Sequence, residues 1–290
     1  MAAGAGRNEY CEGDVASPMD TTPSDIYGRP DVYELEYAES DEEDLRFWIR
    51  ALARLKPARI LELACGAGRV TYALATALRS AQIVGVDSSP EMLAQAATAA
   101  TALGAALTSR VTMHEGDMRR WPGDGQLFDA VVIPCCAVSH LLTLDDRRET
   151  WATALRLLRP GGAFLVDVRT PDLATLAESQ RVKPRAFVDL DIDATRQSLG
   201  EESRLLRCTA TTYEPHLQRA HVRLLYDKFD TRAGTERLVT NYEQHVYFPA
   251  ELDLLFITAG FEIVGRFGDY GFGALSRTSP FLITVARAPA

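Results

Sequence analysis

Apolar residues follow two different spacings along the first half of the chain. Short continuous apolar runs, typical of buried strands, alternate with stretches in which apolar residues recur every three or four positions, as on one face of a helix. Strands that alternate with helices predict a parallel sheet with helices on both faces. The expected strands are residues 59–63, 81–86, 111–114, 128–133 and 163–168, the expected helices are residues 41–55 (capped by Ser40 or Asp41), 69–80, 90–102 and 147–158, and a turn is expected at residues 160–162.

The pattern changes after Pro171, where segments rich in Thr, Val, Tyr and Phe are separated by turn residues, which favours antiparallel strands. The chain then returns to a helical segment closed by Gly260, followed by two apolar runs. We therefore predict an α/β fold with a doubly wound, mostly parallel, seven-stranded sheet and an inserted antiparallel β subdomain. The inserted strands are expected at residues 185–192, 204–213, 220–229 and 236–248, and the last helix and strands at 249–259, 261–267 and 281–286.

Composition narrows the class of protein. The 290 residues are 47% hydrophobic, enough for a full core, and the net charge of -9 argues against a nucleic-acid surface. No apolar run reaches the ~20 residues that span a bilayer. The five cysteines lack the spacing of a zinc site, so we expect reduced thiols and a cytoplasmic protein. The expected parts are a disordered leader (1–25), an α/β domain (26–170 and 249–290) and the insertion (171–248).

The first expected strand runs into a glycine-rich turn before a helix. Gly66 and Gly68 let the backbone turn sharply and let a ligand approach without a Cβ in its way. The third glycine of the dinucleotide fingerprint is replaced by Thr71, and Glu62 before the turn can hold an ammonium group, which a pyrophosphate lacks. An ordinary strand–turn–helix join fits the same residues.

Polar side chains follow the next three strands as well. Asp87 ends the second strand about 20 residues after the glycines, where an acid can accept hydrogen bonds from both ribose hydroxyls. A simple helix N-cap by Asp87 or the serines after it is the alternative. Asp117 and Met118 follow the third strand and can contact an adenine ring. Residues 134–140 follow the fourth strand, at the edge of the sheet where a reacting group is expected.

In this order and spacing, the segments resemble the class I S-adenosylmethionine-dependent methyltransferases, whose seven-stranded sheet is Rossmann-like. The resemblance covers roughly residues 26–170 and 249–287. It implies that S-adenosyl-L-methionine is the cofactor and S-adenosyl-L-homocysteine the product. The residues it implies at the cofactor are Glu62, Gly66 and Gly68 at the methionine part, Asp87 at the ribose, Asp117 and Met118 at the adenine, Cys135 at the border, Tyr27, Tyr33 or Tyr37 as a lid or as packing residues, and also Ala64, Ser88 and Met92.

The insertion resembles the antiparallel β subdomain of small-molecule methyltransferases that act on natural products such as amino sugars, glycopeptides or polyketides. We therefore expect methyl transfer to nitrogen or oxygen, and less readily to carbon, of a small-molecule acceptor, with neither nucleic acid nor membrane as a partner. An edge strand of the insertion can pair two copies in a homodimer. No motif in the insertion names the acceptor.

An amine or hydroxyl acceptor has a proton to lose during methylation. His140 is the first candidate for the base, because it follows the fourth strand at the reaction edge and histidine accepts protons near neutral pH. Helix capping or packing is its alternative role. The further substrate candidates are Ser139, His221, His245 and Tyr270, with Tyr242 and Tyr247 as cavity-lining residues, and packing or solvent exposure is the alternative for each.

Two other functions fit parts of this pattern. A nicotinamide-dependent oxidoreductase shares the strand–glycine–helix unit, but Thr71 and Glu62 argue against it. A non-catalytic S-adenosylmethionine-binding protein would keep the cofactor residues without turnover. The adjacent Cys135 and Cys136 would suit a metalloid substrate, yet small buried thiols are common core residues, and we expect no metal.

Overall fold

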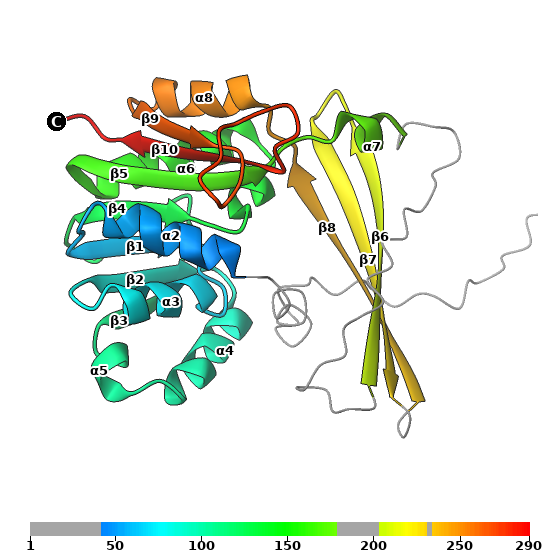
Figure 1. Ribbon diagram of the computed structural model, residues 1–290, viewed down its shortest axis with the longest axis horizontal. Coiled ribbons are helices and arrows are strands. Elements are labelled where there is room, and N and C mark those ends of the chain that lie inside the picture. The colour runs from blue at the N-terminus through cyan, green and yellow to red at the C-terminus, as the bar shows by residue number, and fades with distance from the viewer. Residues whose placement is uncertain (1–41, 179–202, 231–233) are drawn as a thin grey trace, which may run out of the picture.

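The computed structural model describes residues 42–178, 203–230 and 234–290 of the chain (Figure 1). The main sheet has seven strands in the order β3-β2-β1-β4-β5-β10-β9. Strands β1 to β5 pair in parallel, and β10 runs antiparallel to both β5 and β9. The predicted α/β class with its mostly parallel sheet is thus confirmed. The strands are β1 (Arg59–Leu63), β2 (Gln82–Asp87), β3 (Val111–Glu115), β4 (Phe128–Ile133), β5 (Leu158–Arg169), β9 (Glu262–Phe267) and β10 (Phe281–Arg287).

Helices cover both faces of this sheet (Figure 1). Helices α2 and α3 bury Phe47, Trp48 and Leu74 against one face, and α6 and α8 bury Trp151 and Phe256 against the other. No helix in the described part of the chain is long and apolar enough to cross a membrane. The helices are α2 (Glu43–Ala53), α3 (Arg69–Ala77), α4 (Pro90–Thr101), α5 (Ala105–Thr108), the 3-10 helix η2 (Ala137–His140), α6 (Leu144–Leu157), α7 (Leu173–Glu178) and α8 (Pro249–Thr258).

The alternation of side chains along β1 decides where its one carboxylate lies. Leu61 and Leu63 join the core beneath α6 and α8, whereas Ile60 joins the core beneath α2 and α3. Glu62 is two residues from Ile60 and therefore points to the α2–α3 face. There it accepts a hydrogen bond from the Thr71 hydroxyl on α3.

A separate antiparallel sheet is formed by β6 (Ser203–Glu214), β7 (Arg219–Asp230) and β8 (Gly234–His245), in that order. One face carries the buried apolar residues Ala220, Val222 and Leu224. The predicted strand at residues 185–192 lies outside the described residues. The boundaries of the insertion and homodimer formation through its edge stay predictions.

The three-stranded sheet is fastened to the main domain just after β8. The Tyr247 ring is buried, and its hydroxyl donates a hydrogen bond of 2.9 Å to the carbonyl of Val138 in η2. Tyr247 also packs edge-on against His245, with ring centroids 4.7 Å apart. The strand that leads out of the insertion is therefore held directly against the short helix that carries His140.

Helices α5, η2 and α7 were not predicted, and two other differences from the predicted elements have a clear physical cause. Residues 160–162, predicted as a turn, belong to β5, where an irregular pairing with β4 accommodates Gly161 at a φ of 71°. Helix α6 begins at Leu144 rather than at residue 147, because the Thr143 side chain accepts a hydrogen bond from the Asp146 N–H and caps it. A threonine followed by an acid three residues later is a helix-start signal that the apolar pattern alone does not show.

The Tyr247 contact gives a test of how the insertion is fastened. Tyr247→Phe keeps the ring and removes one of two hydrogen bonds to the Val138 carbonyl, which also accepts the Leu141 N–H at 3.0 Å. We expect the free energy of unfolding to fall by about 0.5–1.5 kcal/mol, the net value of one such bond. Urea unfolding followed by circular dichroism measures it. An unchanged unfolding midpoint and slope would show that the hydroxyl contributes nothing.

Candidate functional site

A cavity of about 300 Å³ opens at the carboxyl ends of β1 to β4. In a doubly wound sheet, ligands bind at this edge, close to the point where the strand order reverses. The cavity brings together six of the residues singled out in the sequence, namely Ala64, Asp87, Ser88, Asp117, Met118 and His140. Its other lining residues are Gly116, Arg119, Leu141 and Asp146.

The glycine turn at one end of the cavity is held by the carboxylate of Asp87. One carboxylate oxygen accepts the Gly66 N–H at 2.7 Å, and the other accepts the Ser89 N–H at 2.9 Å. Gly68 has a φ of 83°, and a Cβ there would lie 2.6 Å from the Tyr72 ring. Met92 is buried under the turn, with its methyl carbon 3.8 Å from where a Cβ on Gly66 would be. Glycine is therefore required in this turn, both by the left-handed backbone conformation and by the lack of room for a Cβ at Gly68.

Glu62 is a buried carboxyl group beneath this turn. Its side chain is 1% exposed, and burial raises its pKa to about 8, although the Thr71 hydrogen bond and the charge of Arg69 act in the opposite direction. A buried carboxyl group with a raised pKa is stabilised in its charged form by a neighbouring cation. The ammonium group of a bound ligand would supply that charge. Glu62 is not among the residues that line the cavity, and its contact with the methionine part of the cofactor stays a prediction.

Asp117 lies at the other end of the cavity and is engaged by a neighbour that the sequence reading missed. Its oxygens accept hydrogen bonds from the Arg119 side-chain Nε at 2.9 and 2.8 Å and from the Arg119 backbone N–H at 2.9 Å. These bonds lower the pKa of the Asp117 carboxyl group. Asp117 is therefore a charged acceptor whose orientation is set before any ligand arrives. The sequence offered one signal, an arginine two residues after the acid.

The chain leaves β4 through a turn with two consecutive non-glycine residues in the left-handed conformation. Cys135 and Cys136 have φ angles of 60° and 57°. Such conformations cost of order 1–3 kcal/mol each and persist only where the surroundings hold them. Arg69 donates to the Cys135 sulfur at 3.2 Å and also pairs with Asp44. Burial raises the pKa of the Cys135 thiol to about 12, so this cysteine is a neutral packing group.

Asp167 at the end of β5 holds the same turn from the other side. It is fully buried, accepts the Cys136 N–H at 2.9 Å and accepts the hydroxyl of Tyr270. Burial raises the pKa of Asp167 to about 6. Tyr270, a predicted substrate residue, is thereby a hydrogen-bond partner of Asp167, and it is not among the residues that line the cavity. Asp167 itself was missed, because one acid in an apolar strand gives no signal about its partners.

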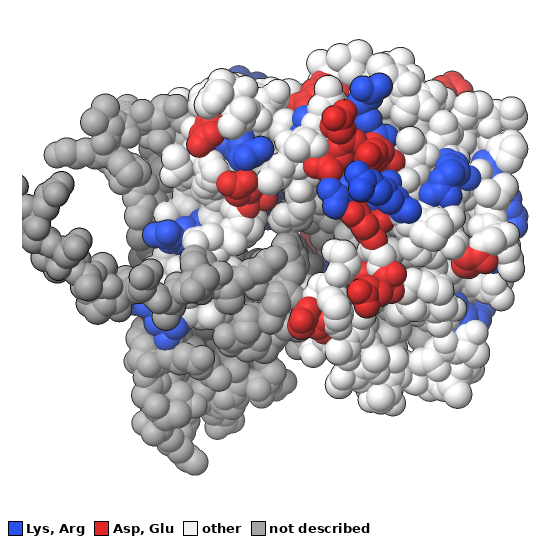
Figure 2. Space-filling model, turned by 180° about the vertical axis from the view of Figure 1, so that it is seen from behind, with Lys and Arg blue, Asp and Glu red and all other residues white. Residues whose placement is uncertain are grey.

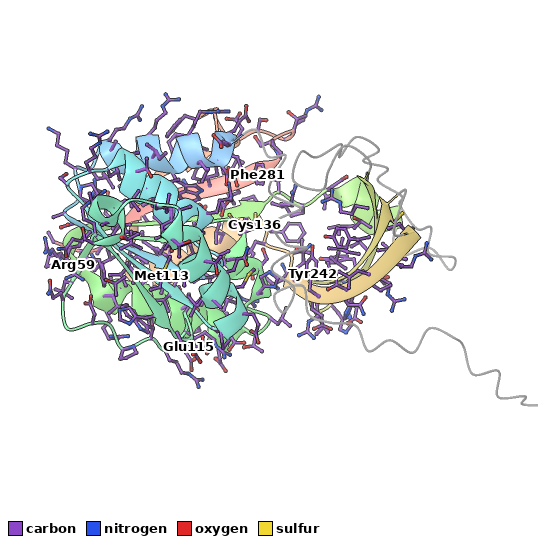
Figure 3. All side chains as sticks on the ribbon, turned by 90° about the horizontal axis from the view of Figure 1, so that it is seen from below. Arg59, Met113, Glu115, Cys136, Tyr242 and Phe281 are labelled. Carbon is purple, nitrogen blue, oxygen red and sulfur yellow. The ribbon has the colours of Figure 1, made fainter. Side chains whose placement is uncertain are left out.

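His140 lies where the cavity meets the three-stranded sheet. It lines the cavity, and its ring centroid is 5.8 Å from that of Tyr242 on β8. Figure 3 shows Tyr242 on the side of the three-stranded sheet that faces the main domain and Cys136. Ser139 is 7% exposed and belongs to the packed part of η2. The cavity and the insertion therefore meet at one histidine.

The other two histidine candidates contact carboxylates away from the cavity. His221 lies on the opposite face of its sheet from Tyr242, between Glu214 at 3.1 Å and Glu243 at 2.9 Å. His245 is buried and contacts Glu251 of α8 at 2.8 Å. Both positions fit the packing alternative. Tyr27, Tyr33 and Tyr37 lie outside the described residues.

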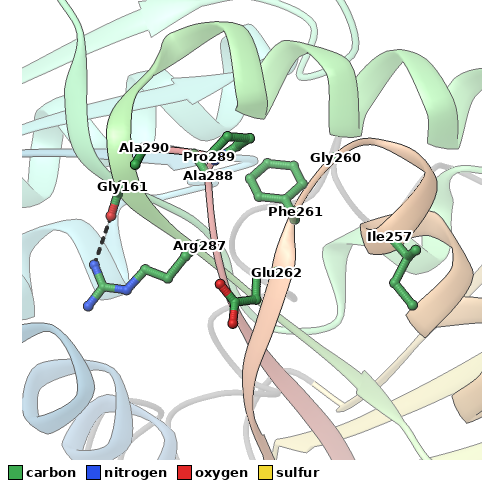
Figure 4. A pocket seen from close by; sticks show the side chains of 9 residues that line it. All are labelled: Gly161, Ile257, Gly260, Phe261, Glu262, Arg287, Ala288, Pro289 and Ala290. Carbon is green, nitrogen blue, oxygen red and sulfur yellow. Dashed lines mark hydrogen bonds between the residues drawn. The ribbon is translucent and has the colours of Figure 1, made fainter.

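A second cavity, of about 500 Å³, lies at the opposite edge of the main sheet (Figure 4). Glu262 and Arg287 line it, and Arg287 donates a hydrogen bond of 3.0 Å to the Gly161 carbonyl. This is the amino end of β5, away from the strand ends where ligands of such sheets bind. The cavity at β1 to β4 is therefore the candidate active site.

Comparison with known proteins agrees with this geometry. A family model described as a methyltransferase domain matches residues 60–162. YqeM of Bacillus subtilis, which carries the name of a methyltransferase, is 35% identical over 144 residues, 49% of this chain and 55% of the relative. The trans-aconitate 2-methyltransferase of Streptomyces avermitilis is 34% identical over 170 residues, 54% of this chain and 60% of the relative. The chain thus spans little more than half the length of these curated relatives.

Solved structures extend the likeness to nearly the whole chain. An S-adenosylmethionine-dependent methyltransferase from Clostridium acetobutylicum superimposes with a TM-score of 0.71 at 17% identity, over 90% of this chain and 98% of the other. The CcbJ methyltransferase from Streptomyces caelestis has a TM-score of 0.70 at 25% identity, over 92% and 99%. Residues 60–162 therefore form a methyltransferase domain, and the fold is that of the class I S-adenosylmethionine-dependent methyltransferases.

The buried Asp167 predicts a pH dependence of stability. Its pKa is about 6 in the folded protein, against about 3.9 for an unfolded aspartate. The folded state therefore holds the proton more tightly, and this group's contribution to stability is lost as the pH rises from about 4 to about 6. In Asp167→Asn that loss is absent.

Measuring unfolding free energies of wild type and Asp167→Asn between pH 4 and pH 7 isolates this group, because all other titrations cancel in the difference. We expect the difference to change by roughly 2 kcal/mol in favour of the variant between pH 4 and pH 7, since one pKa unit corresponds to about 1.4 kcal/mol and an unfolded aspartate is already about half ionised at pH 4. A difference that stays constant over this range would mean that Asp167 titrates normally.

Proposed function

We propose that this chain transfers the methyl group of S-adenosylmethionine to an amine or hydroxyl of a small-molecule acceptor held between the cavity and the three-stranded sheet. One observation carries the proposal. Asp87, Asp117 and His140 line a single cavity, and Tyr242 of the insertion contacts His140 at its mouth. Cofactor residues and an acceptor surface therefore meet at a group that can take a proton.

In this proposal the cofactor lies along the ends of β1 to β3. Glu62 faces the ammonium of the methionine part, Asp87 accepts from the ribose hydroxyls with its remaining lone pairs, and Asp117 and Met118 contact the adenine. When bound, S-adenosylmethionine supplies a methyl group on a sulfonium, a leaving group that needs no acid. The protein's main tasks are then proximity and alignment, which can contribute up to ~7–11 kcal/mol.

The insertion is the proposed acceptor surface. Val222, Leu224 and Tyr242 share the face of the sheet that is apolar, and charged pairs such as Arg237–Asp227 occupy the other face. Val222 and Leu224 are themselves buried, so a ring-shaped acceptor would contact this face at Tyr242, next to His140. The apolar face also keeps water from the reacting atoms, which strengthens electrostatic contacts there.

Amino sugars are the acceptor class to test first. CalS10, an amino pentose methyltransferase from Micromonospora echinaspora, matches with a TM-score of 0.66 over 88% of this chain. KedS8, a sugar N-methyltransferase from Streptoalloteichus sp., matches with a TM-score of 0.65 over 100% of it. Their identities of 23% and 16% support a shared fold, and the acceptor class is our inference from the shared two-part architecture.

His140 is the proposed base. The acceptor's nitrogen or oxygen lone pair forms the new bond to the methyl carbon while the carbon–sulfur bond breaks, and the acceptor's proton passes to the neutral imidazole. The contact with Tyr242 and the burial of Ser139 hold the histidine at the junction of the two parts. General base catalysis by a positioned side chain is worth about 10²–10⁴-fold in rate.

The activity itself is tested by S-adenosylhomocysteine formation with a panel of amino sugars and their nucleotide conjugates, each paired with its hydroxyl analogue. Product with the amines alone assigns nitrogen as the methylated atom. Calorimetry with S-adenosylmethionine, NAD and NADP separates the oxidoreductase alternative, because binding of a nicotinamide cofactor without S-adenosylmethionine binding contradicts our proposal. Tight binding of the methyl donor with no turnover across the panel favours a non-catalytic binding protein.

The raised pKa of Glu62 predicts proton release on ligand binding. At pH 7 a carboxyl group with a pKa of about 8 is mostly protonated, and a bound ammonium favours its ionised form. S-adenosylhomocysteine binding should therefore release about one proton. Calorimetry in phosphate and in Tris buffer, which have different ionisation enthalpies, measures it. Glu62→Gln should bind more weakly and release none, and equal heats in both buffers for the wild type would place the ammonium elsewhere.

Replacing His140 separates catalysis from cofactor binding. His140→Ala should lower turnover by about 10²–10⁴-fold, because the acceptor loses its base. Its affinity for S-adenosylhomocysteine should stay close to the wild-type value. His216→Ala, in the exposed turn between β6 and β7, is the matched control and should leave both unchanged. Full activity of His140→Ala from pH 6 to pH 9 would remove His140 from this role.

A further inference from the structure

Residues 119–122 of the loop after β3 are bonded to one face of α6. Four α6 residues that are three or four positions apart, and so share one helical face, hold the loop. Charged side chains of both signs gather over α6 on this side of the molecule (Figure 2). The contacts are Arg119–Asp146 (2.6 Å), Arg120–Glu149 (2.8 Å), Thr153 to the Arg119 carbonyl (2.6 Å), and Arg156 to the Trp121 and Pro122 carbonyls (2.6 and 2.9 Å).

Arg119 differs from the other fastened residues because it lines the candidate cofactor cavity. Its guanidinium group connects two acids that also line that cavity, Asp117 in the loop and Asp146 in the first turn of α6. Arg120 forms an ion pair with the same helix but is not among the cavity-lining residues, and its side chain is 69% exposed. Comparing variants of these two arginines therefore distinguishes the effect of holding the loop against α6 from the effect of lining the cavity.

The chain of contacts continues from Asp146 toward the reaction end of the cavity. Asp146 accepts the Thr143 hydroxyl at 2.6 Å, and Thr143 caps α6 three residues after His140. The hydrogen bonds from Thr143 and from Arg119 lower the pKa of Asp146, so both acids that face Arg119 are charged at neutral pH. A bidentate, charge-assisted arrangement of this kind fixes geometry as well as charge.

We propose that Arg119 is a positioning residue that sets the affinity of the site for the adenosine part of the cofactor. It holds the Asp117 carboxylate in one orientation and ties the cavity wall formed by the loop to the wall formed by α6. A ligand then binds a wall that is already ordered, and ordering on binding is one of the main costs of association. This inference rests on the proposed cofactor site and does not depend on the acceptor.

The test is calorimetry with two probes, S-adenosylhomocysteine and adenosine, on the full chain. Arg119→Met keeps the aliphatic stem and loses every donor. It should weaken both probes at least about tenfold, as expected for the loss of charge-assisted hydrogen bonds. Equal weakening of the two probes locates the effect at the adenosine part. Arg120→Met, the matched control, loses an ion pair to the same helix and should bind both probes as the wild type does.

Two further variants show that the bridge itself is responsible. Arg119→Lys retains the charge but cannot span both acids, so its affinities should lie between those of wild type and Arg119→Met. Asp146→Asn should weaken binding, and the double variant with Arg119→Met should be no weaker than Arg119→Met alone, because both remove one interaction. Arg119→Lys also keeps the test informative where Arg119→Met does not fold.

The outcomes are distinct from those of the proposed function. Failure of the wild type to bind S-adenosylhomocysteine contradicts the proposed function itself. Wild-type binding with unchanged affinities in both Arg119 variants overturns the role of Arg119 alone. Equal losses in Arg119→Met and Arg120→Met also overturn it, because general fastening of the loop would then explain the effect. Weaker S-adenosylhomocysteine binding with unchanged adenosine binding would place the effect at the methionine part and contradict the inference.

Discussion

The carboxylate of Asp87 joins two of the loops that line the candidate active-site cavity. It ends β2, yet one oxygen binds the glycine turn that follows β1, and the other binds the start of α4. Two backbone N–H groups from different loops thus share one anion, and charge-assisted bonds of this kind are among the stronger ones in proteins. The parallel pairing of β1 with β2 brings the two strand ends together, and Asp87 then fixes how the loops leave them. Ala64 and Ser88, which line the cavity, lie in the two loops that this carboxylate joins.

Two buried carboxyl groups lie at the same edge of the sheet, and both cost stability in their charged form. Glu62 is beneath the glycine turn, and Asp167 is behind the turn that leads to His140. Each has a raised pKa because burial removes it from water. Of the acids that the structure describes, these two are the most deeply buried, so they mark where the fold accepts this cost. At Asp167 the carboxyl group also offsets the strain of two left-handed cysteines, which no glycine relieves.

The end of the cavity at His140 is held by contacts between residues that are far apart in the sequence. The short helix η2 is held by Asp167 from β5, by Arg69 from α3 and by Tyr247 from the exit of the insertion. Helix α6 follows η2 at once and carries Asp146, the partner of Arg119. The segment with His140 therefore lies between the loops that line the rest of the cavity and the strand that carries Tyr242. The segment that carries His140 is therefore in hydrogen-bonded contact with both parts of the structure.

The sequence predicted those residues whose contacts are with near neighbours in the chain. The strand–glycine–helix unit, the acid at the end of β2 and the Asp117–Met118 pair depend on neighbours a few positions away. Their spacing therefore predicted the fold class, and the family resemblance that they carry predicted the cofactor and most of the cavity lining. Arg119 and Asp146 are 27 positions apart, and Asp167 and Tyr270 are 103 apart. Nothing in their own segments marks these pairs, because sheet order and helix packing decide which distant side chains meet. The face on which His221 and Tyr242 lie was likewise settled only by strand register, in which one position exchanges the two faces of a sheet.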